Sequence, residues 1–363
     1  MPRKPDATKG TLTGSVICAD TGKPARFAEV QLLPASMFSA HQGSNNDLDL
    51  SETADTGLDG RFTIEAVPPG DYYAFATLNG YLDPERGIDF SRADPNAGDG
   101  DQIADVLSQW KDHFVPVSVT AQHSSEVSIQ IERGSEIDGT VTYDDSTPAI
   151  GVRFKLLRKT AEDKWTPVGE SKGDWSLGET SDSHGRYRIT DLPAGEYKVC
   201  AMLPVQSEES APQICLGDTF RQRNSQAVKV DAGDAAGGAD IVIPLTGLFT
   251  VAGNITVGAD GHSPAQATVR LLYGDDRAMD RSTTIRGDGS FEFQYVPAGN
   301  YILQVTNVQD NGGNSARGSD QQAQPAAEVH RYLDKEVPLS VQGEMNDVNI
   351  TLIEAFPQKS AGP

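Results

Sequence analysis

The chain has 363 residues, of which 37% are hydrophobic, with 36 glycines, 21 prolines and a formal net charge of −22. This length favours about two to four domains, and no stretch is apolar enough to predict a membrane-spanning segment. An acidic surface repels the phosphates of nucleic acids and of anionic lipids, so neither is an expected partner.

The first six residues, Met1 to Asp6, include two basic side chains, but no apolar segment follows them. No signal peptide is therefore recognisable in this sequence. Either the protein is cytoplasmic, or the chain begins after a leader that has been removed. We expect that a leader has been removed, because the chain is predicted to form an array of β modules, and such arrays are typical of proteins outside the cytoplasm.

The chain contains three copies of one pattern, each with two glycines ten residues apart. These pairs stand at positions 60 and 70, 185 and 195, and 289 and 299, and a Gly-x-Val or Gly-x-Ile start precedes them at 14, 139 and 253. A repeat of about 100 residues is long enough to form a domain. We predict three domains, 1–133, 134–245 and 246–363, joined by short linkers into an elongated array.

In chain order, each copy alternates apolar and polar residues with a period of two, which is typical of half-buried strands. A first strand is followed by a proline turn and a second strand; a third strand leads through a Pro-x-Gly turn into a fourth, and two more strands close the copy. The expected inward side chains of the first four strands are Val16, Cys18, Val30, Leu32, Phe62, Ile64, Tyr72, Ala74 and Ala76 in the first copy, Val141, Tyr143, Phe154, Leu156, Tyr187, Ile189, Tyr197, Val199 and Ala201 in the second, and Ile255, Val257, Val269, Leu271, Phe291, Phe293, Tyr301, Leu303 and Val305 in the third. Each copy predicts an antiparallel β-sandwich, and the chain is predicted to be all-β with almost no helix.

The repeated pattern Gly-x-Val, Asp-x-x-Gly-x-Phe/Tyr and Val/Leu-Pro-x-Gly-x-Tyr resembles the carboxypeptidase regulatory-like family. The second copy also resembles a common ending of that family, at 216–219 and 227–233. The resemblance implies transthyretin-like (prealbumin-like, carbohydrate-binding-like) sandwiches, related to the Cna B-type repeats, in a bacterial surface or secreted protein. It implies accessory domains in place of a catalytic one.

The three cysteines fall into two groups. Cys18 alternates with Val16 on the inner face of its strand, so we interpret it as a buried core residue. Cys200 stands between inward residues and points to the outer face of its sheet, and Cys215 follows an excursion that can return the chain over that face. This geometry allows a Cys200–Cys215 disulfide, which would imply an oxidising compartment; the alternative is two free thiols in a cytosolic protein.

No combination of side chains predicts catalysis, a metal or a cofactor. His123 and Glu126 form a His-x-x-Glu like that of metallocarboxypeptidases, but no catalytic α/β domain accompanies them, and we interpret them as coincidence. Arg286-Gly287-Asp288 spells a tripeptide read by integrins, yet it occupies a hairpin turn, where glycine and aspartate are favoured. The acidic segment 94–101 lacks the closing glutamate of a Ca²⁺ loop.

Binding residues are expected in the inserts that differ between copies, because inserted loops on a rigid scaffold commonly carry recognition. The inserts 81–110 and 159–179 contain the three tryptophans of the chain, Trp110, Trp165 and Trp175, which are the candidate binding anchors. Trp165 and Trp175 can stack on sugar rings, or equally pack down on the sheet as a small core of their own.

We expect a monomeric, non-catalytic module without a cofactor, located outside the cytoplasm in the periplasm, at the cell surface or in the medium. Such a module either spaces other domains or recognises a protein or a glycan at the bacterial envelope. The alternatives are a carboxypeptidase-associated regulatory fragment or peptidase, and a carbohydrate-binding protein that uses the tryptophan-bearing inserts.

Overall fold

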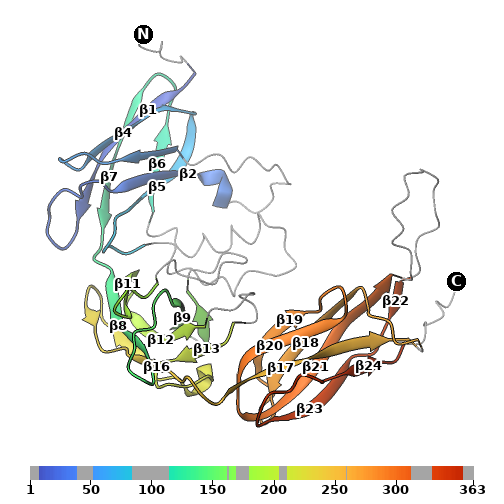
Figure 1. Cartoon of the computed structure of the whole chain (residues 1–363). Coiled ribbons are helices and arrows are strands. Elements are labelled where there is room, and N and C mark those ends of the chain that lie inside the picture. The colour runs from blue at the N-terminus through green and yellow to red at the C-terminus, as the bar shows by residue number, and fades with distance from the viewer. Residues whose placement is uncertain are drawn as a thin grey trace, which may run out of the picture.

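The computed structural model describes residues 8–38, 52–83, 114–161, 163–168, 180–203, 211–258, 260–311 and 329–354. In these ranges the regular elements are strands, apart from two short 3-10 turns, η1 (Ala35–Phe38) and η6 (Gln222–Asn224). The predicted all-β fold is confirmed. Figure 1 shows three groups of strands that follow one another along the chain, and the array bends at the middle group.

Each group is a sandwich of two sheets. The first packs the order β4-β1-β7 against β3-β2-β5-β6, the second packs β11-β8-β15 (with β16 also on β8) against β10-β9-β12-β13 (with β14 also on β12), and the third packs β20-β17-β24 against β19-β18-β21-β22 (with β23 also on β21). The strands of the first sandwich are β1 (Gly10–Cys18), β2 (Glu29–Pro34), β3 (Glu52–Asp55), β4 (Arg61–Val67), β5 (Gly70–Thr77), β6 (Val115–Val119) and β7 (Ser124–Ile131). Those of the second are β8 (Ser135–Tyr143), β9 (Arg153–Lys159), β10 (Trp165–Pro167), β11 (Arg186–Leu192), β12 (Gly195–Met202), β13 (Gln213–Cys215), β14 (Val228–Val230), β15 (Ala235–Ala236) and β16 (Ile241–Ile243). Those of the third are β17 (Leu248–Val257), β18 (Gln266–Tyr273), β19 (Met279–Thr284), β20 (Ser290–Pro297), β21 (Gly299–Asn311), β22 (Val329–Arg331), β23 (Lys335–Val341) and β24 (Ile350–Leu352).

Two features of this topology go beyond the sequence pattern. The first strand of each sandwich pairs in parallel with the closing strand, as β1 does with β7, β8 with β16 and β17 with β24. An alternation with a period of two identifies a strand but does not give its direction. The chain crosses from the larger sheet to the smaller one before the closing strand, and this crossing sets the direction of that strand. The short edge strands β3, β10 and β19 lie in segments that the sequence pattern did not assign to strands.

Buried apolar side chains form three main clusters, one between the sheets of each sandwich. The inward positions predicted for the first four strands are all buried except Tyr143, which is half-buried against its cluster. Cys18 is a buried free thiol, as expected. Leu248 lies at the start of β17 but packs against the cluster of the second sandwich, so the linker into the third sandwich is itself anchored.

The first glycine of each copy, in its Gly-x-Val or Gly-x-Ile start, is needed because the neighbouring backbone leaves no room for a side chain. A Cβ atom on Gly14, Gly139 or Gly253 would lie 2.2 Å, 2.3 Å and 1.9 Å, respectively, from a carbonyl oxygen of the closing segment of the same sandwich. Real Cβ atoms do not approach a carbonyl so closely, so alanine would force the sheet apart. The Gly-x-Val start of each copy is thus a packing requirement of the first strand.

The Pro-x-Gly-x-Tyr motif forms the tight turn that leads from the third strand of each copy, in one sheet, to the fourth strand, in the opposite sheet. The hydroxyl groups of Tyr72, Tyr197 and Tyr301 donate to the carbonyl oxygen four residues earlier, at distances of 2.8 Å, 2.5 Å and 3.0 Å. All three tyrosines are buried, so this bond satisfies the one polar atom of a ring that fills the core. Burial raises the pKa of Tyr197 to about 12.

Candidate functional site: the joint between the second and third sandwiches

Of the three predicted anchors, Trp165 is described by the structure, whereas Trp110 and Trp175 lie outside the described residues. Trp165 begins β10, at the edge of the larger sheet of the second sandwich, and is half-buried. Its ring packs against a small outer cluster that consists of Leu157, Cys200 and Cys215. Trp165 therefore packs down on the sheet, the second of the two arrangements that the sequence allowed.

A disulfide joins Cys200 to Cys215 on this outer face. Cys200 lies on β12 directly opposite Cys215 on β13, and both residues are fully buried. The period of the strand explains the position, because the neighbours Val199 and Ala201 point into the core and leave Cys200 on the other face.

Lys198 is the next outward residue of β12 and lies beside the disulfide. It is 5% exposed, its ammonium nitrogen lies 4.7 Å from the centre of the Trp165 ring, and it donates to the carbonyl oxygen of Gln222 at 2.5 Å. Burial lowers the pKa of Lys198. A buried ammonium group is costly unless carbonyls and an aromatic face replace its water, and this site supplies both.

Residues 216–226, which we call the clasp segment, run from the disulfide over Lys198 and return to the sheet. The segment leaves the edge of β12 after β13 and rejoins it at β14. At the start of the segment the backbone amide of Leu216 donates to the carbonyl oxygen of Val199, and at its end the amide of Gln226 donates to the carbonyl oxygen of Leu216. Between them, η6 lies over Lys198. Both ends of the clasp segment are therefore fastened to the second sandwich.

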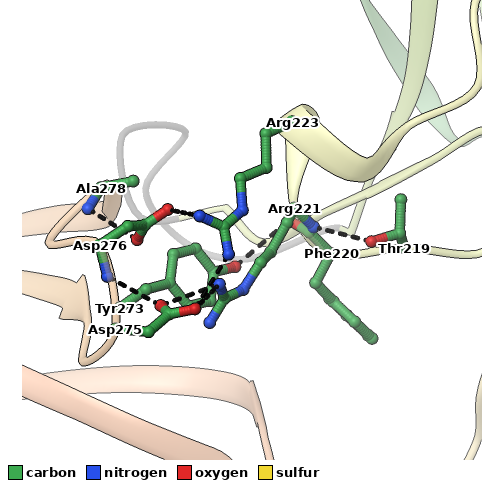
Figure 2. A network of polar contacts seen from close by, with 8 residues as sticks. All are labelled: Thr219, Phe220, Arg221, Arg223, Tyr273, Asp275, Asp276 and Ala278. Carbon is green, nitrogen blue, oxygen red and sulfur yellow. Dashed lines mark hydrogen bonds and ion pairs between the residues drawn. The ribbon is translucent and has the colours of Figure 1, made fainter.

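Two arginines of the clasp segment contact the third sandwich (Figure 2). The Nη1 atom of Arg221 donates to both carboxylate oxygens of Asp275, at 2.9 Å and 2.8 Å, while Arg223 donates to Asp275 at 2.9 Å and to Asp276. The Arg221 guanidinium also stacks on the ring of Tyr273, 3.9 Å from its centre. We call these five side chains the arginine clasp.

The backbone holds the geometry of the arginine clasp. Figure 2 shows both aspartates on the turn that follows β18, where the amide of Ala278 donates to Asp276 at 3.1 Å. The hydroxyl group of buried Tyr273 donates to the carbonyl oxygen of Phe220 at 3.3 Å, which adds a hydrogen bond across the joint that involves no ion pair. The hydrogen bond from Arg221 holds the pKa of Asp275 well below its usual range.

Beside the arginine clasp, the joint leaves a cleft of about 260 Å³ between the clasp segment and residues 297–301 of the third sandwich. Asn224 and Asn300 are among the residues that line it. The joint is thus not a closed apolar interface, and its directional contacts are charged and aromatic.

The joint between the first and second sandwiches is bonded in a comparable way. Arg133, in the linker between β7 and β8, makes an ion pair with Asp20 at 3.0 Å and stacks 4.4 Å from the centre of the Tyr81 ring. From the second sandwich, the carboxylate of Asp191 accepts a hydrogen bond from the amide of Gly80 at 2.6 Å.

The other sequence motifs take part in turns. His123 lies in the turn before β7, with its Nδ1 atom 2.8 Å from the carbonyl oxygen of Ala121. Asp288 accepts a hydrogen bond from the amide of Ser290 at 3.0 Å, and Arg286 pairs with Glu292 at 3.2 Å, so both charged residues of the integrin-like tripeptide belong to local turn contacts. The acidic segment 94–101 lies outside the described residues.

The described residues contain neither a metal-binding cluster nor a membrane-spanning helix. They hold no group of three or more histidine, cysteine, aspartate or glutamate side chains placed to bind a metal ion. They also contain no helix with the length and apolar character needed to cross a membrane.

No sequence motif predicts the arginine clasp. Arg221 and Arg223 lie in an excursion of the second copy, and Asp275-Asp276 lie in a hairpin of the third, so no motif links them. The available signal was complementary charge, an Arg-x-Arg in one insert and an Asp-Asp in the next copy. Only the fold places the two beside each other.

No family model matches the chain, and no curated protein sequence matches it. Among solved structures, a streptococcal ancillary pilin is 13% identical, with 96% of this chain and 100% of the pilin covered at a TM-score of 0.27. The major pilin subunit of Bacillus cereus is 9% identical, with 95% and 99% covered at a TM-score of 0.22. The Bacillus anthracis TIE protein is 12% identical, with 95% of this chain and 51% of that protein covered at a TM-score of 0.21, so the chain spans about half its length.

Proposed function

We propose that the chain is a non-catalytic structural module of the bacterial envelope that holds its two ends at a fixed separation and angle. The observation that supports this function best is the bonding of both joints. Arg133 holds the first linker against the first sandwich, Asp191 bonds across the first joint to Gly80, and the arginine clasp fastens the second joint. Flexible spacers instead use glycine- and serine-rich linkers without such contacts.

The proposed location is outside the cytoplasm. The Cys200–Cys215 disulfide supports it, because such bonds persist in oxidising compartments and are rare in the cytosol. The finer family assignment that we propose is carboxypeptidase regulatory-like, related to Cna B-type repeats, as one chain of three domains (1–133, 134–245 and 246–363). It rests on the tripled glycine and tyrosine motifs, each of which has a packing role in every copy.

Glycan recognition through Trp165 is the weaker candidate. A sugar-binding aromatic side chain presents an open face, whereas Trp165 packs against the disulfide and Lys198. A glycan array with wild-type protein and the Trp165→Ala variant separates the two functions. Binding that the substitution abolishes would favour the lectin function, and wild-type protein that binds no glycan leaves the spacer function.

Small-angle X-ray scattering of the full chain tests the proposed function. We expect the wild-type curve to fit a single bent arrangement of the three sandwiches. The variant Asp191→Gly removes the carboxylate that bonds across the first joint and tolerates the positive φ of this position. This variant and Arg221→Met/Arg223→Met should each require a mixture of arrangements. Arg286→Met is the matched control, because its ion pair with Glu292 lies within the third sandwich. A wild-type curve that already requires a broad mixture would refute a spacer of fixed shape.

A further inference from the structure

The clasp segment is held to the second sandwich on both faces of one short edge strand. β13 has three residues, and its partner is β12. Ile214 anchors the inner face of β13 in the core, while Cys215 anchors the outer face through the disulfide to Cys200. Without the disulfide, the outer face of β13 would have no covalent tie to the sheet that carries it.

The disulfide and the arginine clasp are linked by a short series of contacts. Cys200 and Lys198 are adjacent outward residues of β12, and Trp165 lies against both. Lys198 donates to the carbonyl oxygens of Gln222, at 2.5 Å, and Arg223, at 3.5 Å. These two carbonyls belong to the turn that carries the arginines, so a displacement of this turn moves Arg223 away from Asp275 and Asp276.

We infer that formation of the Cys200–Cys215 disulfide, together with Lys198, fixes the orientation of the third sandwich relative to the second, a role that rests on the proposed spacer function. The oxidation removes two protons and two electrons from the two thiols. A disulfide of an oxidising partner protein accepts them and becomes a dithiol. The joint is therefore completed by oxidation, and a chain that folds with free thiols has three folded sandwiches but a loose second joint.

The ion pairs alone do not account for a fixed joint. The side chains of Asp275 and Arg223 are 55% and 49% exposed, and those of Arg221 and Asp276 are 24% and 25% exposed. Ion pairs that remain accessible to solvent contribute little unless their geometry is held. The cleft beside them shows that the joint is not closed by apolar packing on that side. What holds the arginines in place is the attachment of the clasp segment, which combines backbone hydrogen bonds at its two ends with the contacts to Lys198 and the disulfide.

Distance measurements between the second and third sandwiches test this inference on the full chain. Nitroxide labels are attached through a ketone-bearing amino acid at Ile150 and Leu333, which are 65% and 57% exposed, so no added cysteine is needed. The distance distribution is measured by pulsed electron double resonance for the wild type, for Cys200→Ala/Cys215→Val, which keeps the small outer cluster apolar, and for Lys198→Met. Cys18→Ser, which removes the buried free thiol, is the matched control.

We expect a narrow distribution for the wild type and for Cys18→Ser, and a broadening of more than about twofold for the two other variants, as for a joint without fixed contacts. Lys198→Met should leave the thermal unfolding of the second sandwich unchanged or raised, because it replaces a buried charge by an apolar chain of similar length. A narrow distance distribution in Cys200→Ala/Cys215→Val would overturn the inference. Unfolding of the second sandwich in that variant would also overturn it, because the disulfide would then stabilise the sandwich itself and not the joint. A broad wild-type distribution would instead contradict the proposed spacer function.

Discussion

The substitution Gly139→Ala should destabilise the second sandwich strongly. The new Cβ atom would lie 2.3 Å from the carbonyl oxygen of Ala239 and 3.1 Å from the ring of Tyr187. Forcing one extra carbon into a packed site costs about 1–3 kcal/mol. The same carbonyl oxygen accepts the hydrogen bond of the buried Tyr187 hydroxyl at 2.5 Å, and leaving that hydroxyl unsatisfied costs about another 1–3 kcal/mol.

The expected loss in the free energy of unfolding is therefore about 2–6 kcal/mol. Urea unfolding of the full chain measures it, with Trp110 and Trp175 replaced by phenylalanine so that the fluorescence of Trp165 reports the second sandwich. With a urea slope of about 1–3 kcal/mol per molar, the urea midpoint should fall by at least about 0.7 M.

Gly237→Ala is the matched control. Its Cβ atom would have no neighbour closer than 3.5 Å, and that neighbour is the carboxylate of Asp138. We expect its free energy of unfolding to lie within about 0.5 kcal/mol of the wild-type value. Equal midpoints for Gly139→Ala and Gly237→Ala would refute the argument that the first glycine of each copy is a packing requirement.

Tyr301→Phe should lower the free energy of unfolding of the third sandwich by about 1 kcal/mol, measured by calorimetry of the full chain, because the hydrogen bond to Pro297 is lost. The second joint should stay closed from pH 7 down to the usual aspartate range and open only below it. In the closed joint the hydrogen bond from Arg221 lowers the pKa of Asp275 from its ordinary value of 3.8. The stabilisation from this carboxylate is therefore fully present above pH 3.8 and is lost as the pH falls through the lowered pKa. Scattering across this range checks it, and opening near pH 5 would contradict it. The fragment 134–245, produced under oxidising conditions, should fold alone and give a dispersed NMR spectrum; a collapsed spectrum would contradict the proposed domain boundary.

The fold class and the inward face of almost every main strand follow from the amino-acid pattern alone. Alternation with a period of two depends only on which side chains are apolar. The glycine recurs because the neighbouring backbone leaves no room for a side chain, and the tyrosine recurs because its hydroxyl group bonds to the Pro-x-Gly turn beside it. The alternation also placed Cys200 on the outer face of β12, because its two neighbours point inward.

The tertiary structure decided what local pattern cannot encode. The direction of each closing strand follows from a crossing between sheets, and the choice between an open and a packed Trp165 depends on what covers the sheet beneath it. The arginine clasp joins residues more than fifty positions apart in two different copies. This contact forms only when the second and third sandwiches meet, because the strand pattern of each copy is complete without the other copy.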